Sequence, residues 1–104
     1  MAHKLKKKLT SKPKARARVF AALGDRTRVA LVAQLAVRPG SSIAQLGEGI
    51  EMTRQAVTKH LEVLERAGVV RSRLSGRERL FELEREPLEA ALEFLEVVVA
   101  QRVK

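Results

Sequence analysis

Apolar residues recur at helical spacing in the first half of the chain, as in helices that bury one face. The first such run predicts a helix over residues 15–23 that ends at Gly24. Asp25 then provides an N-cap for a second helix, which Pro39 and Gly40 stop. The second helix is predicted to bury one face, formed by Val29, Val32 and Leu35. The first helix is short, so it needs a partner surface to be stable.

Capping signals predict two more helices. Ser42 and Gln45 have the spacing of a capping box, which starts a short third helix. The residues of this helix expected to point inward are Ile43, Leu46 and Ile50. Thr53 caps a fourth helix, and Met52 and Val57 are placed as a hydrophobic staple at its start.

The fourth helix places apolar and polar residues on opposite faces. Its core stripe consists of Val57, Leu61 and Leu64. Its other face carries Arg54, Gln55, Thr58, Lys59 and Glu62. Gly68 supplies the left-handed stop at its C-terminal end. Because the second face is polar, mostly non-acidic and long enough to lie in a groove, it is a candidate surface for double-stranded DNA.

Beyond the fourth helix the period of the pattern becomes two, which indicates β-strands. The alternating residues are Val70, Ser72 and Leu74 against Val69, Arg71 and Arg73. Ser75 and Gly76 supply a turn, and a second strand follows over residues 79–83. The sequence therefore predicts a hairpin with basic residues around its tip.

A last helix is predicted from Pro87, which suits the first helical position. Its apolar stripe consists of Leu88, Leu92, Leu95 and Val99, and Ala91, Phe94 and Val98 widen it. A helix this apolar at the end of a small domain is expected to pack on a second subunit. The alternative is that the stripe belongs to the core of its own chain.

A chain of 104 residues has room for one hydrophobic core. We expect a domain over residues 15–104, preceded by a basic, flexible arm over residues 1–14, which has too few apolar groups to order it. The absence of cysteine excludes disulfides and thiolate metal sites. No apolar run approaches the roughly 20 residues that span a bilayer, so the expected localisation is cytoplasmic, without a membrane partner.

The net charge of +9 suggests a nucleic-acid partner, but most of the excess charge lies outside the expected folded domain. Residues 1–18 carry eight Lys and Arg and no acid, whereas the rest has 13 basic and 12 acidic residues. Within the folded part, only residues 53–79 are electropositive, with seven basic residues against three acids. The charge of the folded part is therefore concentrated on the fourth helix and the hairpin.

An enzyme is not expected. The chain has no Cys or Tyr, its two His residues are far apart in sequence, and it lacks a Gly-rich phosphate loop. No catalytic residue, metal site or cofactor is predicted, because His3 and His60 are the sole histidines and a metal site needs several convergent ligands.

The order of helices and hairpin is the plan of a winged helix-turn-helix: mainly α, with five helices and a two-stranded wing. Residues 17–100 resemble the ArsR/SmtB family of bacterial dimeric transcriptional repressors. The residues that carry the resemblance include Thr53, Val57, Thr58, His60, Leu61, Leu64, Ala67, Gly68, Val69 and Val70. The resemblance implies a two-fold dimer, built by the first and last helices, with recognition helices in successive major-groove turns about 34 Å apart. Family members repress by occupying promoter DNA and often leave it when an inducer binds.

The resemblance and the residue pattern together give two sets of site residues. The predicted DNA contacts are Thr53, Arg54, Gln55, Thr58, Lys59, His60, Arg71, Arg73, Ser75, Arg77 and Arg79. The predicted dimer contacts are Val19, Phe20, Leu88, Leu92, Leu95 and Val99. The family's metal-binding motifs, a Cys-containing third helix or acidic and His ligands in the last helix, are not present. A small-molecule effector is not identified, and Glu51 stands where many relatives have a turn glycine.

Several alternatives stay open at this point. His60 is either a DNA contact or a packed, hydrogen-bonded imidazole. The basic arm is either a solubilising tail or a sequence-neutral grip on DNA. The whole protein is either a sequence-specific regulator, of this or a related winged-helix family, or a basic architectural protein that binds nucleic acid by charge alone. A winged helix used only for protein contacts would leave the polar face and the arginine hairpin without a role.

Overall fold

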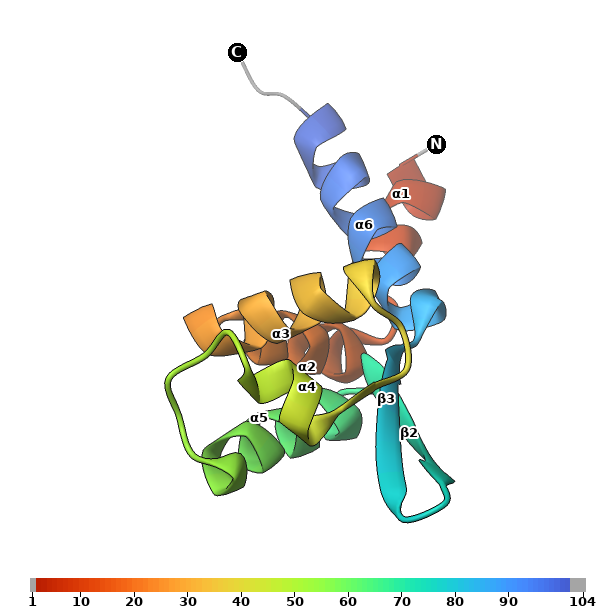
Figure 1. Cartoon of the computed structure of the whole chain (residues 1–104). Coiled ribbons are helices and arrows are strands. Elements are labelled where there is room, and N and C mark those ends of the chain that lie inside the picture. The colour runs from red at the N-terminus through yellow and green to blue at the C-terminus, as the bar shows by residue number, and fades with distance from the viewer. Residues whose placement is uncertain (1, 102–104) are drawn as a thin grey trace.

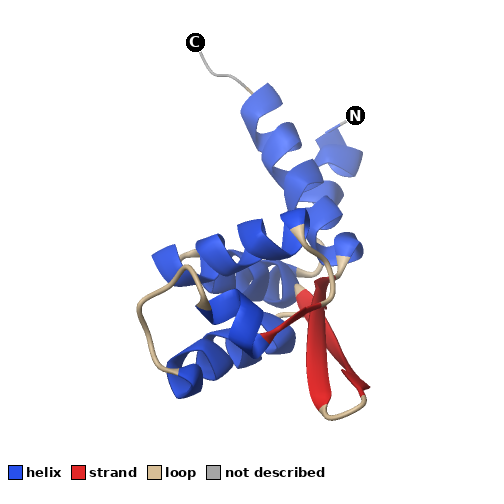
Figure 2. Cartoon of the chain, in the orientation of Figure 1, coloured by secondary structure: helices blue, strands red, loops and turns tan. Residues whose placement is uncertain are grey.

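Helices and one small antiparallel sheet make up the computed structural model, which describes residues 2–101 (Figures 1 and 2). The helices are α1 (Ala2–Thr10), α2 (Pro13–Leu23), α3 (Arg26–Val37), α4 (Ile43–Gly47), α5 (Arg54–Arg66) and α6 (Arg85–Ala100). The strands are β1 (Ser41–Ser42), β2 (Val70–Ser75) and β3 (Glu78–Leu83). Figure 1 shows α2, α3, α4 and α5 packed together, with the β2–β3 hairpin projecting beside them and α6 rising with α1 in the other direction.

The core lies where α2, α3 and α5 meet the base of the sheet. Its most buried large side chains are Leu31, Leu35, Leu46, Val57, Leu61, Leu64, Val69 and Val70. The predicted stripe of α5 is confirmed, because Val57, Leu61 and Leu64 are all at most 1% exposed. The predicted caps at Asp25, Ser42 and Thr53 are confirmed by hydrogen bonds to backbone N–H groups.

The sheet has three strands in the order β1-β3-β2, so the prediction of a two-stranded wing is incomplete. Ser41 pairs with Phe81, and Ser42 pairs with Leu80. Two buried serines give no alternation of apolar and polar residues, so nothing in the pattern indicates this strand. The hairpin turn comprises Gly76 and Arg77, because Ser75 pairs with Glu78, and Gly76 has the positive φ of 64° that such turns require.

The predicted buried face of α3 is confirmed in part. Leu35 is buried and Val32 packs against the core, whereas Val29 is 50% exposed and Leu31, which was not predicted, is buried. Apolar residues lie on almost every side of this helix, so helical spacing alone does not select a face. Contacts with α2, α5 and β3 select the side that carries the two leucines.

The N-terminal segment contains helix α1, where the sequence suggests a flexible arm. Leu5 and Leu9 are four residues apart and half-buried, and α1 packs on α6. The guanidinium of Arg16 donates to the carbonyl oxygens of Leu9 at 2.7 Å and Lys8 at 3.1 Å, at the C-terminal end of α1. The two leucines and an arginine of the next helix therefore stabilise α1. The prediction of a flexible arm rests on the many lysines and few apolar residues of this segment, and it does not consider these contacts.

Helix α6 combines a buried side with an exposed apolar side. It begins at Arg85, so Pro87 lies at its third position, still in the first turn where backbone N–H groups lack helical partners. Ala91 is buried against the core, and Leu88 packs beside it. The large exposed apolar residues of this helix are Leu92, Leu95, Val98 and Val99. Within residues 2–101, none of the helices has the length and apolar character needed to cross a membrane.

The N-cap of α3 leads to a prediction about acid stability. The backbone N–H of Arg28 donates to the Asp25 carboxylate at 3.1 Å, and this bond, with the nearby charge of Arg28, holds the pKa of Asp25 below its ordinary value. A lowered pKa stabilises the fold above the unfolded-state pKa, and this contribution is lost as pH falls through the folded-state pKa. In Asp25→Asn the cap persists without a titrating group.

We therefore expect the melting temperature of the wild type to fall relative to that of Asp25→Asn as pH decreases below about 4. Thermal unfolding followed by circular dichroism between pH 7 and pH 3 measures this difference. A gap between the two proteins that stays constant over this range contradicts the assignment.

Candidate nucleic-acid interface

The exposed side of α5 begins at a well-capped N-terminus. The Thr53 hydroxyl accepts a hydrogen bond from the backbone N–H of Ala56 at 3.1 Å, which fixes the first turn. Because Val57, Leu61 and Leu64 hold the opposite side in the core, Arg54, Gln55 and Lys59 are exposed and Thr58 is half-buried. The predicted polar face of the fourth helix is thus at the surface.

Strand pairing divides the wing arginines between the two faces of the hairpin. Arg73 lies opposite Leu80, and Arg71 lies opposite Glu82, so both arginines belong to one face. Arg79 lies opposite Leu74 on the other face, the face that contacts α5. The wing arginines therefore do not form one continuous surface.

Hydrogen bonds distinguish these arginines further. The Nε of Arg71 is 3.0 Å from Glu82 Oε1 and 2.9 Å from Glu84 Oε1, so Arg71 forms ion pairs with two carboxylates. Arg79 donates to the Ser72 hydroxyl at 3.0 Å, and that hydroxyl donates to Glu65 of α5 at 3.0 Å. This chain of bonds orients Arg79 toward α5.

A groove of about 400 Å³ lies between the start of α5 and the wing. Arg54 and Thr58 line it from α5, and Arg77 and Arg79 line it from the wing. Three arginines thus line one concavity, with Glu78 as its acidic member. Arginines grouped in this way suit a phosphate-bearing ligand, because a guanidinium binds phosphate oxygens in a bidentate manner.

Besides Glu78, two residues that were not predicted as contacts line the groove. Ser42, the N-cap of α4, and Ile43 line it beside the arginines. They reach the groove because β1 pairs with β3, a strand pairing without a sequence signal. The predicted contacts that do not line this groove are Thr53, Gln55, Lys59, His60, Arg71, Arg73 and Ser75.

His60 lies against the N-terminus of α3. Its Nδ1 is 3.2 Å from a guanidinium nitrogen of Arg28 and 3.8 Å from the carboxylate of Asp25. Arg28 also donates to the carbonyl oxygen of Ala22 at 2.7 Å, so it links α2, α3 and α5. These contacts favour the packed, hydrogen-bonded alternative for His60 over a DNA contact.

The predicted dimer contacts separate into buried and exposed residues. Val19 is 4% exposed, so it has almost no surface left for a second copy. Phe20 packs on Phe94 with ring centroids 5.8 Å apart, and Leu88 packs against the core. Leu92, Leu95 and Val99 are between 46% and 61% exposed.

Across residues 2–101, no three His, Cys, Asp or Glu side chains are grouped so that they could hold a metal ion.

Comparisons with known proteins agree with this geometry. A family model described as a helix-turn-helix domain matches residues 23–73. An uncharacterized HTH-type transcriptional regulator of Bacillus subtilis, YuzN, is 38% identical over 80 residues, which are 71% of this chain and 87% of that protein. An ArsR-like transcriptional regulator from Rhodococcus sp. RHA1 has a similar solved structure, with a TM-score of 0.76 and 33% identity over 88% of this chain and 86% of that chain.

A homodimeric winged helix-turn-helix DNA-binding domain from Mycobacterium bovis shares the fold at a TM-score of 0.66 and 22% identity, over 84% of this chain and 78% of that one. The helix order, the wing and the sequence relatives all lead to one assignment. The chain belongs to the ArsR/SmtB family of winged helix-turn-helix transcriptional regulators.

Proposed function

We propose that this protein is a dimeric repressor that binds a palindromic DNA operator through α5 and the wing. The observation that carries the proposal is the groove in which Arg54 of α5 meets Arg77 and Arg79 of the wing. A recognition helix placed in the major groove and a wing beside it would bring these arginines to one stretch of DNA backbone.

The residues of α5 differ in what they can recognise. A guanidinium such as that of Arg54 matches the O6 and N7 of guanine, and the carboxamide of Gln55 matches the N6 and N7 of adenine. Lys59 is exposed one turn further along the helix and is assigned to a phosphate. Arg77 and Arg79 are assigned to phosphates on the wing side of the groove.

The dimer part of the proposal rests on α6. Leu92, Leu95, Val98 and Val99 form an exposed apolar surface on a helix that ends away from α5 and the wing (Figure 1). Exposed apolar residues grouped on one helix are typical of an interface. A second copy packed there would leave both recognition helices free to reach two half-sites.

Selection of bound sequences from random duplex DNA tests the proposal. We expect an imperfect palindrome whose half-sites are centred about one helical turn, roughly 34 Å, apart. Placing the selected sequence over a promoter should then lower transcription in a purified system. A collection without any shared sequence contradicts operator recognition, and a bound promoter with unchanged or raised transcription contradicts repression.

Arg54 should determine the base preference at one position of each half-site. Arg54→Ala is expected to relax the preference at one base position per half-site by ~1–3 kcal/mol, because the guanidinium no longer pairs with the base edge. Arg66→Ala is the matched control, since Arg66 is also exposed on α5 but lies in its last turn. Affinities for a set of single-base operator variants measure the effect. Equal losses on all sequences would make Arg54 a phosphate contact instead.

A further inference from the structure

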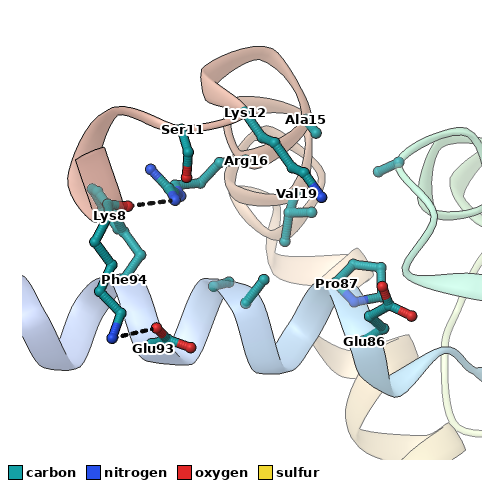
Figure 3. Close-up of a pocket in the computed structure, with 13 residues that line it drawn as sticks. Lys8, Ser11, Lys12, Ala15, Arg16, Val19, Glu86, Pro87, Glu93 and Phe94 are labelled. Atoms are coloured by element: carbon teal, nitrogen blue, oxygen red, sulfur yellow. Dashed lines mark hydrogen bonds and ion pairs between the residues drawn. The ribbon is translucent and has the colours of Figure 1, made fainter. Parts of the chain in front are cut away.

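A second concavity, of about 380 Å³, lies between α1, α2 and α6 (Figure 3). It shares none of its lining residues with the groove between α5 and the wing. The junction of α1 and α2 borders it on one side, residues 86–94 of α6 border it on the other, and Ala67, the C-cap of α5, also lines it. Its volume falls within the roughly 300–1,000 Å³ of small-molecule sites.

The polar side of this cavity carries positive charge that acids do not fully neutralise. Lys8 is paired with Glu93, with 2.8 Å between Nζ and the carboxylate oxygen. Arg16 donates to two backbone carbonyl oxygens, and its guanidinium carbon lies 4.3 Å from the centre of the Phe94 ring. None of these partners of Arg16 carries a negative charge, so its positive charge is available to a ligand.

Lys12 is the second available cation. Figure 3 shows its side chain running past Ala15 and Val19 toward α6. In the described part of the chain, no hydrogen bond or ion pair engages its ammonium group. With Glu86 included, three cations and two acids line the cavity, which leaves a net charge of +1.

The backbone holds Lys12 in an unusual conformation. Its φ of 48° and ψ of 50° are left-handed, and within residues 2–101 it is the one non-glycine residue with positive φ. This region is sterically unfavourable for lysine, and such residues are concentrated at functional sites. Here the conformation forms the sharp junction between α1 and α2, which closes one side of the cavity.

Apart from Ser11, the remaining walls are apolar and made mostly of small side chains. They are Ala15, Val19, Pro87, Ala90, Ala91 and Phe94. Small side chains leave room for a flat apolar body between α2 and α6. A cavity with mainly apolar walls and a few polar groups is the usual form of a small-molecule site.

We propose that this cavity binds a small organic anion with an aromatic body. The acidic group of the ligand lies near Lys12, Arg16 adds to the positive charge of the cavity, and the ring of the ligand lies against Ala15, Pro87 and Ala90. The site is distinct from the apolar surface of α6, because Leu92, Leu95 and Val99 do not line it. Only the further step, an influence of such a ligand on DNA binding through Ala67 at the end of α5, rests on the proposed function.

Titration of the full-length protein with 2-naphthalenesulfonate, in the absence of DNA, tests the site. In proton–nitrogen NMR spectra we expect saturable shifts grouped on residues 11–16 and 86–94. The neutral analogue 2-naphthol should bind at least 10-fold more weakly, because it lacks the anion. Equal binding of the two probes contradicts an anion site.

Two pairs of variants separate the cavity from the general surface. Ala15→Trp fills the cavity and should abolish the binding, whereas Ala17→Trp adds the same ring at an exposed position outside it and should leave binding unchanged. Lys12→Gln should weaken binding at least 5-fold, whereas Lys14→Gln should not.

Each contrary result overturns the proposal. These results are wild-type affinity in Ala15→Trp, equal effects of Lys12→Gln and Lys14→Gln, shifts grouped on the exposed face of α6, and no saturation at millimolar probe. Because DNA is not present in this assay, such a failure would leave the proposed operator binding standing.

Discussion

Leu95→Glu should convert the protein from a dimer to a monomer and lower its affinity for a palindromic operator at least 100-fold. Leu95 is 46% exposed in the middle of the apolar surface of α6, so glutamate is compatible with the fold of the single chain. Burying that carboxylate against the same residue of a second copy would be strongly unfavourable. A dimer that binds two half-sites at once has about 10²–10⁴ higher affinity than a monomer that binds one half-site. The monomeric variant loses this advantage.

Sedimentation equilibrium and fluorescence anisotropy with labelled operator measure the two effects of Leu95→Glu. Val37→Glu is the matched control, because Val37 is 86% exposed at the end of α3 and lies outside α6. This control should remain dimeric and bind DNA as the wild type does. A dimeric Leu95→Glu protein, or a wild type that is monomeric at micromolar concentration, contradicts the proposed interface.

The double variant Arg77→Ala/Arg79→Ala should lower operator affinity at least 100-fold at about 0.15 M salt. Each dimer would lose four guanidinium groups, two per subunit, that we assign to phosphates. The release of about four fewer counterions should also reduce the slope of log affinity against log salt concentration by roughly four. Arg79 is in addition held toward α5 by Ser72, so its loss removes an oriented contact.

Arg71→Ala is the control for the wing. Arg71 is an arginine of the same hairpin, but Glu82 and Glu84 already engage it. We expect it to change affinity by less than about 3-fold, as is usual for an exposed group whose charge is already paired. Anisotropy titrations at several salt concentrations compare the two proteins. A wing variant with an unchanged salt slope would show that Arg77 and Arg79 do not contact phosphates.

Local signals in the sequence were sufficient for much of this architecture. A cap is a contact between residues three apart, and for that reason Asp25, Ser42 and Thr53 could be identified as helix starts. The stripe of Val57, Leu61 and Leu64 was equally readable, because α5 has one clearly apolar side. These elements place the candidate recognition helix without any information from distant parts of the chain.

Features that depend on distant partners were not readable in this way. Strand β1 exists because Ser41 and Ser42 pair with β3, about 40 residues away, and serines give no strand pattern. Helix α1 depends on Arg16 and on contacts with α6. In the candidate site, the ion pair of Arg71 with Glu82 depends on the strand register. The position of the turn sets this register, and the sequence locates the turn only to within a residue or two.

The central claim is that this chain reads DNA sequence through α5 and the wing. Its most direct test is the affinity of the full-length protein for a duplex selected from random DNA, compared with a scrambled duplex of equal length at about 0.15 M salt. A specific regulator should bind the selected duplex at least about 10³-fold more tightly and keep it under excess random DNA. Equal affinities for the two duplexes would instead describe a protein that binds by charge alone, and would contradict this account.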